Sequence, residues 1–126
     1  MKLEAKDTPE SFVDKRDYMI NLVLNIKNKT SFFPDLRKQD QGYYRELYYN
    51  ELIEKIKEQY PNDVQLVVIK ENQNILYVIK KGLSIFICEG SGKVSVSQIK
   101  MEFNEFMDNF QHQSKYKKFF SSIFDW

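Results

Sequence analysis

The chain contains a single cysteine and a single histidine, the first residues to consider for nucleophilic or metal chemistry. Cys88 ends the apolar run 83–88, and His112 lies in the polar stretch 111–113. A zinc site needs several His, Cys or carboxylate ligands at close spacing, and a Cys-His pair needs an activated thiolate. We interpret Cys88 as a small buried apolar residue and His112 as a solvated one. The sequence therefore predicts no catalytic residue, no metal site and no cofactor.

Two further patterns share residue types with enzymes. The segment 90–93 reads Gly-Ser-Gly-Lys, but it lacks P-loop spacing and links two predicted strands, so we predict a hairpin turn there. Asp63, Glu71 and Glu89 flank predicted strands, whereas a metal-dependent nuclease needs acids clustered at one end of a sheet beside a lysine. Nothing in their spacing brings these acids together. We therefore predict that the protein is not an enzyme.

Basic residues mixed with aromatic ones are typical of surfaces that bind nucleic acid through phosphate contacts and stacking. The segment 37–45 mixes both types, and lysines recur at predicted hairpin ends, where they could form a patch at one edge of the sheet. The candidate residues are Arg37, Lys38, Arg45, Lys70, Lys80, Lys81, Lys115, Lys117 and Lys118. The net charge is only +1, whereas a nucleic-acid-binding domain is usually strongly basic. Nucleic-acid binding is therefore the second hypothesis.

Tyrosines form two adjacent pairs on the helix predicted over 40–60, and the pairs spread over more than half of its circumference. This spread is too wide for one buried stripe, so some tyrosines must face a second layer, a partner or water. Tyrosine suits a contact surface because it offers apolar area with a polar tip. The candidate partner-binding residues, with two from the aromatic C-terminus, are Tyr43, Tyr44, Tyr48, Tyr49, Phe124 and Trp126.

The C-terminal segment is dense in aromatic residues. Phe119, Phe120 and Ile123 have the spacing of a terminal helix packed on the domain. The segment 113–120, with Gln113 and two aromatics, and the tail 121–126 resemble the short motifs by which replication proteins dock onto sliding clamps. This resemblance implies that a nucleic-acid-binding accessory protein would dock a replication clamp through its C-terminal tail.

Composition is typical of one soluble globular domain. The chain has 126 residues, of which 42% are hydrophobic and 29% charged. A lone cysteine cannot form an internal disulfide, and we see no signal peptide or membrane span. We expect a cytoplasmic protein with no membrane contact, organised as a single domain over 1–126 with a disordered N-terminus at 1–7. Lysine outnumbers arginine by 16 to 3, which indicates an AT-rich bacterial or viral genome.

Helices are predicted at both ends of the domain. Thr8, Pro9 and Glu10 form a helix start, and apolar residues at helical spacing extend the first helix over 9–28. Residues 29–40 are predicted to be a loop with a short turn at 35–37. A second helix covers 40–60. A third starts at Ser97, and a further helix follows near 116–123.

The middle of the chain is predicted to be a sheet. Residues 64–70 and 75–80 are rich in β-branched types and flank a four-residue loop, as in a hairpin. A third strand at 83–88 follows, with a short fourth at 93–96. Segregated helices and strands predict an α+β fold, a small antiparallel meander of three to four strands covered by helices on at least one face.

The sequence lacks catalytic and metal-binding motifs, its net charge is near neutral, and it has more aromatic residues than one core stripe needs. These features favour a small non-enzymatic protein that binds another protein or itself. Such a protein could be an inhibitor, an immunity protein or a regulatory factor carried by a phage or other mobile element. A nucleic-acid-binding accessory protein is the alternative.

Overall fold

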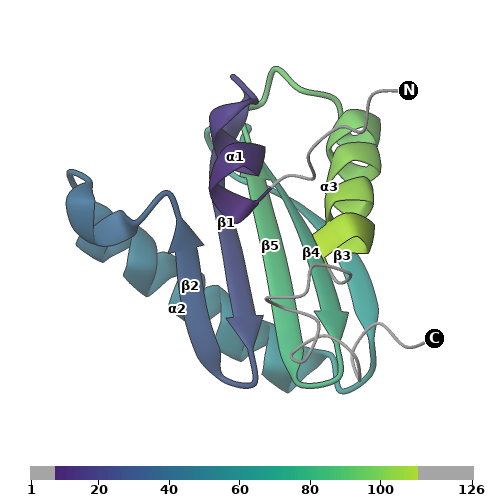
Figure 1. Cartoon of the computed structure of the whole chain (residues 1–126). Helices are drawn as coiled ribbons and strands as arrows, with labels where there is room; N and C mark the ends of the chain where they lie inside the picture. Colours follow the sequence, from purple (N-terminus) through teal and green to yellow (C-terminus); the bar gives the residue numbers. More distant parts are fainter. Residues whose placement is uncertain (1–7, 111–126) are drawn as a thin grey trace.

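The computed structural model describes residues 8–110, and residues 1–7 and 111–126 lie outside the described part. The disordered N-terminus predicted at 1–7 and the helix and clamp-docking tail predicted beyond residue 110 therefore stay predictions. In chain order (Figure 1), the elements are α1 (Pro9–Asp14), β1 (Met19–Ile26), β2 (Lys29–Phe33), η1 (Leu36–Lys38), α2 (Gly42–Gln59), β3 (Val64–Ile69), β4 (Ile75–Lys81), β5 (Ser84–Gly90) and α3 (Val96–Phe110).

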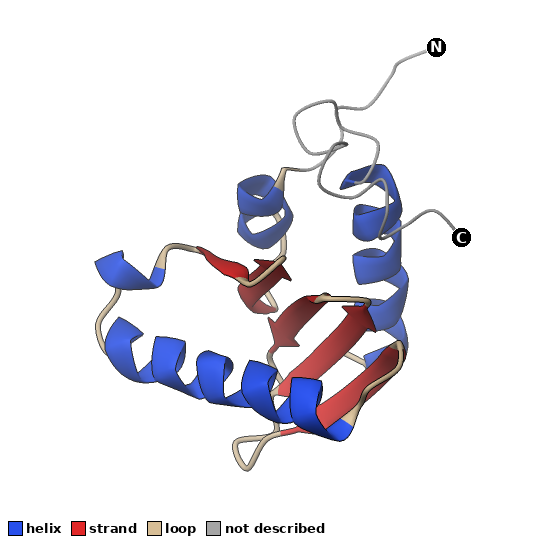
Figure 2. Ribbon diagram, turned by 90° about the horizontal axis from the view of Figure 1, so that it is seen from below, coloured by secondary structure: helices blue, strands red, loops and turns tan. Residues whose placement is uncertain are grey.

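The strands of the described chain form one antiparallel sheet in the order β2-β1-β5-β4-β3. Figure 2 shows α2 on one face of the sheet and α1 with α3 on the other, which gives three layers. The fold is α+β as predicted, but the sheet has five strands instead of three or four. The predicted meander is β3-β4-β5, and β1 extends it by pairing with β5.

The helix predicted over 9–28 is wrong after its first turns. α1 begins as predicted, because the Thr8 side chain accepts a hydrogen bond from the Ser11 N–H and Pro9 lies at the first helical positions. The helix has only six residues, and β1 then runs through Met19–Ile26 with most side chains buried. A central strand covered on both faces has no polar alternation, so its apolar residues also fitted a helical period.

The loop predicted over 29–40 is wrong in its first part, where β2 lies. Lys27 and Asn28 join β1 to β2 with φ angles of 51° and 70°. Two consecutive left-handed residues are typical of the type I′ turn, whose twist matches a hairpin. The second part holds the predicted short turn as η1, where the Asp35 carboxylate accepts a hydrogen bond from the Arg37 N–H at 3.0 Å.

The rest of the described chain agrees better with prediction. α2, the β3–β4 hairpin and α3 lie within about two residues of the predicted ranges. The strand predicted at 93–96 is wrong, because Val94 N donates to Ser91 O at 3.2 Å in a turn and α3 begins at Val96.

An apolar core fills each side of the sheet. On the side of α1 and α3, the ring centroids of Phe12 and Phe106 are 4.5 Å apart, and those of Phe106 and Phe110 are 5.2 Å apart. On the other side, Tyr49 and Ile53 of α2 pack against β4 and β5. β4 and β5 are consequently buried on both faces, which agrees with their nearly uninterrupted apolar sequences.

Candidate functional site

The edge strand β3 is less well covered than the strands beside it. Its sequence, Val-Gln-Leu-Val-Val-Ile, contains no charged residue. Val67 and Ile69 are 40% and 67% exposed, and Leu66 and Val68 on the α2 side are only partly buried. Edge strands usually carry charges, bulges or prolines that prevent further pairing. β3 lacks charge and proline, so it offers a surface to which another strand can add.

The backbone of β3 also presents hydrogen-bonding groups on this edge. Lys70 N donates to Asn74 O at 2.9 Å where the hairpin closes, and Ile69 then lies opposite Ile75. Hydrogen-bonded and non-hydrogen-bonded pairs alternate along an antiparallel ladder. The N–H and C=O groups of Val67 and Ile69 therefore point away from β4. Within residues 8–110 no strand lies on that side.

A pocket of about 430 Å³ lies between the start of α2, the β3–β4 turn and the end of β5. We call it the tyrosine pocket; its lining residues are Ile20, Gln41, Tyr44, Arg45, Tyr48, Tyr49, Lys70, Asn72, Asn74 and Glu89. Gln41 in its wall and Gln73 in the adjoining turn have φ angles of 60° and 67°. Its volume falls in the range of small-molecule sites.

Glu89 lies in the tyrosine pocket and is 2% exposed. Its Oε1 accepts a hydrogen bond from the Tyr49 hydroxyl at 2.5 Å, and its Oε2 accepts one from Asn74 Nδ2 at 3.0 Å. Lys70 Nζ also donates to Oε2, at 3.3 Å. Because a buried carboxylate is stable only with such partners, this network fixes α2, the β3–β4 turn and β5 relative to one another.

Arg45 brings a second cation to the tyrosine pocket. Its Nη1 donates to two neutral amide oxygens, Asn21 Oδ1 at 3.4 Å and Gln39 Oε1 at 3.3 Å. No carboxylate in residues 8–110 forms an ion pair with it. The pocket therefore contains two cations, Arg45 and Lys70, against the single carboxylate of Glu89.

Two tyrosines of this pocket, Tyr48 and Tyr49, have raised pKa values. Burial is the main cause that raises the pKa of Tyr49 far above its ordinary value, followed by the charge and the hydrogen bond of Glu89. Burial and then Glu89 raise the pKa of Tyr48 as well. Lys70 Nζ lies 4.4 Å from the centroid of the Tyr48 ring, a cation–π contact. Neutral phenols in this setting donate hydrogen bonds and offer ring faces.

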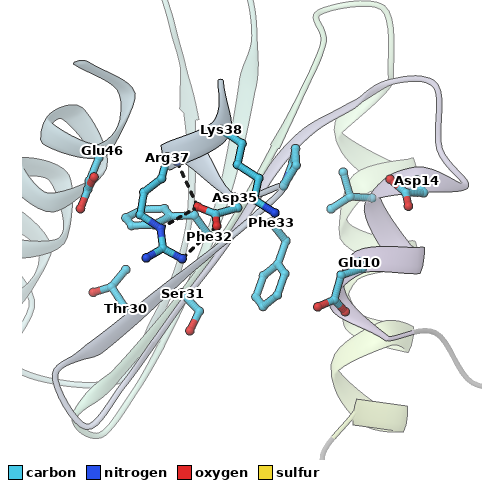
Figure 3. A pocket seen from close by; sticks show the side chains of 12 residues that line it. Glu10, Asp14, Thr30, Ser31, Phe32, Phe33, Asp35, Arg37, Lys38 and Glu46 are labelled. Atoms are coloured by element: carbon cyan, nitrogen blue, oxygen red, sulfur yellow. Dashed lines mark hydrogen bonds and ion pairs between the residues drawn. The ribbon is translucent and has the colours of Figure 1, made fainter. Parts of the chain in front are cut away.

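A second, larger hollow of about 700 Å³ follows the outer strand β2, between α1 and η1 (Figure 3). The Arg37 guanidinium forms two hydrogen bonds with the Asp35 carboxylate, at 3.0 Å and 3.2 Å, and Arg37 is the better-exposed partner. The charged residues lining the hollow are four carboxylates, Glu10, Asp14, Asp35 and Glu46, and two cations, Arg37 and Lys38. This excess of negative charge opposes the phosphate contacts predicted for Arg37 and Lys38.

The predicted partner-binding tyrosines differ in exposure. Tyr43 and Tyr44 are 67% and 69% exposed and are accessible to a partner. Tyr48 is half-buried below Lys70. Tyr49 is 1% exposed and lies in the core, so it cannot act as a contact residue. The two remaining residues of this prediction, Phe124 and Trp126, lie outside the described residues.

The basic patch predicted from Lys70, Lys80 and Lys81 is not formed. The antiparallel register places Lys80 at the opposite end of the hairpin from Lys70. Lys80 is 7% exposed, and its Nζ donates to Gly82 O at 3.0 Å. Lys81 Nζ lies 3.7 Å from Asp63 Oδ2. Of the predicted set, Arg45 and Lys70 share the tyrosine pocket, and Arg37 and Lys38 share the hollow along β2. The other lysines, Lys115, Lys117 and Lys118, lie outside the described residues.

Cys88 is completely buried, which confirms its interpretation as a core residue, and burial raises the pKa of its thiol. Residues 8–110 contain no group of three or more His, Cys, Asp or Glu side chains that could hold a metal ion. No helix in the same range is long and apolar enough to cross a bilayer. Glu89, which the sequence placed after the third strand, lies inside β5, so its part in a polar network was missed.

Comparison of the chain with protein-family models, with curated proteins and with solved structures finds no match. Among residues 8–110, the β3 edge and the tyrosine pocket are the features from which we infer a function.

Proposed function

We propose that this protein is non-enzymatic and works by binding another protein, which adds an extended segment to the edge of β3. The observation that carries the proposal is the uncharged edge strand with Val67 and Ile69 exposed and its outer backbone groups directed away from the sheet. In strand addition, the backbone groups supply hydrogen bonds and alternate side chains supply specificity.

The chemistry of β3 favours a protein partner over nucleic acid. A nucleic-acid surface needs cations along its length, whereas Val64–Ile69 contains none. On α2, Tyr43 is 67% exposed and adds apolar area with a polar tip, and Leu47 is 45% exposed and adds apolar area. An inhibitor, an immunity protein or a regulatory factor encoded by a phage or mobile element would use such a surface.

A second copy of the chain is also able to supply the added strand. Two β3 strands that pair antiparallel about a two-fold axis bring no like charges together, because neither contains a charged residue. Self-association through β3 is therefore the form of the proposal that needs no foreign partner.

The test compares Val67→Lys with Leu83→Lys. Both variants add a lysine at an exposed apolar position, but Val67 lies on the β3 edge and Leu83 in the β4–β5 turn, at 75% exposure. Each protein is used to capture partners from a nuclease-treated native lysate, and its mass in solution is measured by sedimentation equilibrium. Circular dichroism confirms that both variants are folded.

The proposal requires a stoichiometric captured protein, or a dimer, that persists in Leu83→Lys and is lost in Val67→Lys. Capture without change in mass identifies a foreign partner, and a dimer without capture identifies self-association. A monomer that captures nothing, or binding that is unaffected by Val67→Lys, overturns the proposal.

A further inference from the structure

We propose that the tyrosine pocket binds a small ligand that joins a phosphate to a planar ring, as a nucleotide does. Arg45 and Lys70 would hold the phosphate, and Tyr44 and Tyr48 would contact the ring. This inference is independent of the β3 edge. It rests on a cavity in which two cations, aromatic rings and amide side chains converge.

The positive charges in the pocket support the phosphate part of the proposed ligand. Arg45 and Lys70 face only one carboxylate in the pocket, that of Glu89, and the Arg45 guanidinium has neutral hydrogen-bond partners. A guanidinium can bind phosphate with two parallel hydrogen bonds. The first turn of α2 adds to this field, because the helix has no side-chain cap and no acidic residue in its first turn. An anion would balance the net positive charge.

The tyrosines in the wall of the pocket support the planar-ring part of the proposed ligand. Tyr44 is 69% exposed while lining the pocket, so one of its faces is free to contact a ligand. Tyr48 already has the Lys70 ammonium 4.4 Å from its ring centroid. Stacking on aromatic side chains is the usual way to bind a planar base whatever its identity. The amides of Gln41, Asn72 and Asn74 lie in the same wall and can form hydrogen bonds with the edge of such a ring.

The hydrogen bonds around Glu89 hold the bottom of the tyrosine pocket in place before a ligand binds. Glu89 is held by Tyr49 and Asn74 and in turn fixes Lys70, so one of the two cations is positioned before any ligand enters. The cavity volume of about 430 Å³ is sufficient for a molecule the size of a mononucleotide.

The experiment titrates the full-length protein with AMP and UMP by isothermal titration calorimetry. Inorganic phosphate, the unphosphorylated nucleosides and a short single strand with and without a 5′-phosphate are measured in parallel. The test variants are Arg45→Gln and Tyr44→Ala. Their matched controls are Arg37→Gln and Tyr43→Ala, which alter the same residue types on exposed positions outside the tyrosine pocket.

We expect saturable mononucleotide binding that weakens by about tenfold or more in Arg45→Gln and in Tyr44→Ala, with both controls unchanged. Added salt should weaken binding. Equal or tighter binding of a 5′-phosphorylated strand would identify a strand end as the source of the phosphate, and weaker binding would identify a free nucleotide. The inference is overturned if none of the phosphorylated probes binds saturably, or if the test variants bind as well as their controls.

Discussion

The hydroxyl of Tyr49 donates a hydrogen bond of 2.5 Å to Oε1 of Glu89, which joins the middle of α2 to β5 in the protein interior. Tyr49 and Glu89 are 1% and 2% exposed. A buried carboxylate needs all of its hydrogen-bond donors, because the loss of one donor leaves part of its negative charge unpaired and away from water. The pair thus connects the helix that lines the tyrosine pocket to the central sheet.

Replacing Tyr49 with Phe removes this hydroxyl and keeps the ring. We expect the free energy of unfolding to fall by about 1–3 kcal/mol, the usual cost of leaving a buried polar group without a partner. Urea denaturation followed by circular dichroism measures the change. Tyr43→Phe is the control, because Tyr43 is 67% exposed and should shift the midpoint little. Equal stability of both variants would show that Tyr49 and Glu89 do not interact as described.

The β1–β2 turn can be tested by a pair of substitutions at Lys27. Its φ angle is 51°, where glycine is unstrained and alanine is not. We expect Lys27→Gly to be more stable than Lys27→Ala by about 1 kcal/mol. In the helix predicted over 9–28, Lys27 would lie in the last turn with an ordinary negative φ, so glycine would have no such advantage over alanine. Thermal denaturation of the two variants measures the difference, and a Lys27→Ala variant as stable as Lys27→Gly would contradict the left-handed turn.

The segment Met19–Ile26 was predicted to be helical because local sequence signals do not distinguish a buried strand from a helix. Local signals were sufficient for α2, whose polar face is exposed, and for the β3–β4 hairpin, whose edge strand alternates. β1 is different, because Leu22, Val23 and Leu24 are all buried between two helical layers. Its partner β5 lies more than sixty residues away, as the pairing of Leu22 with Cys88 shows. Knowledge of that long-range pairing would separate strand from helix there.

The tyrosine pocket was only half predictable for a related reason. Tyr44, Tyr48, Arg45 and Lys70 were selected by residue type, but in separate lists of protein-binding and nucleic-acid-binding residues. Their convergence depends on α2 crossing the end of the β3–β4 hairpin. Glu89 directly follows the apolar run 83–88, and such a placement is a usable signal that a buried charge needs partners.

The reactivity of the Cys88 thiol tests whether β5 is buried in the centre of the sheet. Cys88 is 0% exposed, and its Sγ lies 3.4 Å from the Met19 sulfur. Burial raises the pKa of the thiol, so little reactive thiolate exists at neutral pH. We expect a disulfide reagent such as DTNB to react far more slowly with the native protein than with the denatured chain. Rapid reaction under native conditions would show that β5 is accessible and contradict its central position.

Gly42 should be intolerant of any side chain. A Cβ at this position would lie 1.7 Å from the carbonyl oxygen of Leu36, so η1 and the start of α2 would have to move apart. We expect Gly42→Ala to lower the free energy of unfolding by about 1–3 kcal/mol or more, as other overpacking substitutions do. Glu51→Ala, at an exposed position of α2, is the control and should change stability little. Chemical denaturation measures both, and a fully stable Gly42→Ala would exclude this close approach.

Acid stability should depend on Glu102 of α3. Its carboxylate accepts hydrogen bonds from Arg16 Nε at 2.9 Å and from the Tyr18 hydroxyl, which connects α3 to the segment between α1 and β1. Burial alone would raise the pKa of Glu102, but the hydrogen bonds with Tyr18, Gln98 and Arg16 outweigh it and lower the pKa below its ordinary value of 4.5.

A folded-state pKa below the unfolded value stabilises the protein above pH 4.5, and this contribution is lost as pH falls through the folded pKa. We expect Glu102→Gln to lower the free energy of unfolding at neutral pH by about 1 kcal/mol, since the ion pair is partly solvated. The difference from wild type should shrink below pH 4.5, where wild type loses the same interaction. Glu105→Gln, at an exposed position of α3, should leave the pH profile unchanged. Urea denaturation across this pH range gives the profiles, and a Glu102→Gln curve parallel to wild type would contradict the assigned role.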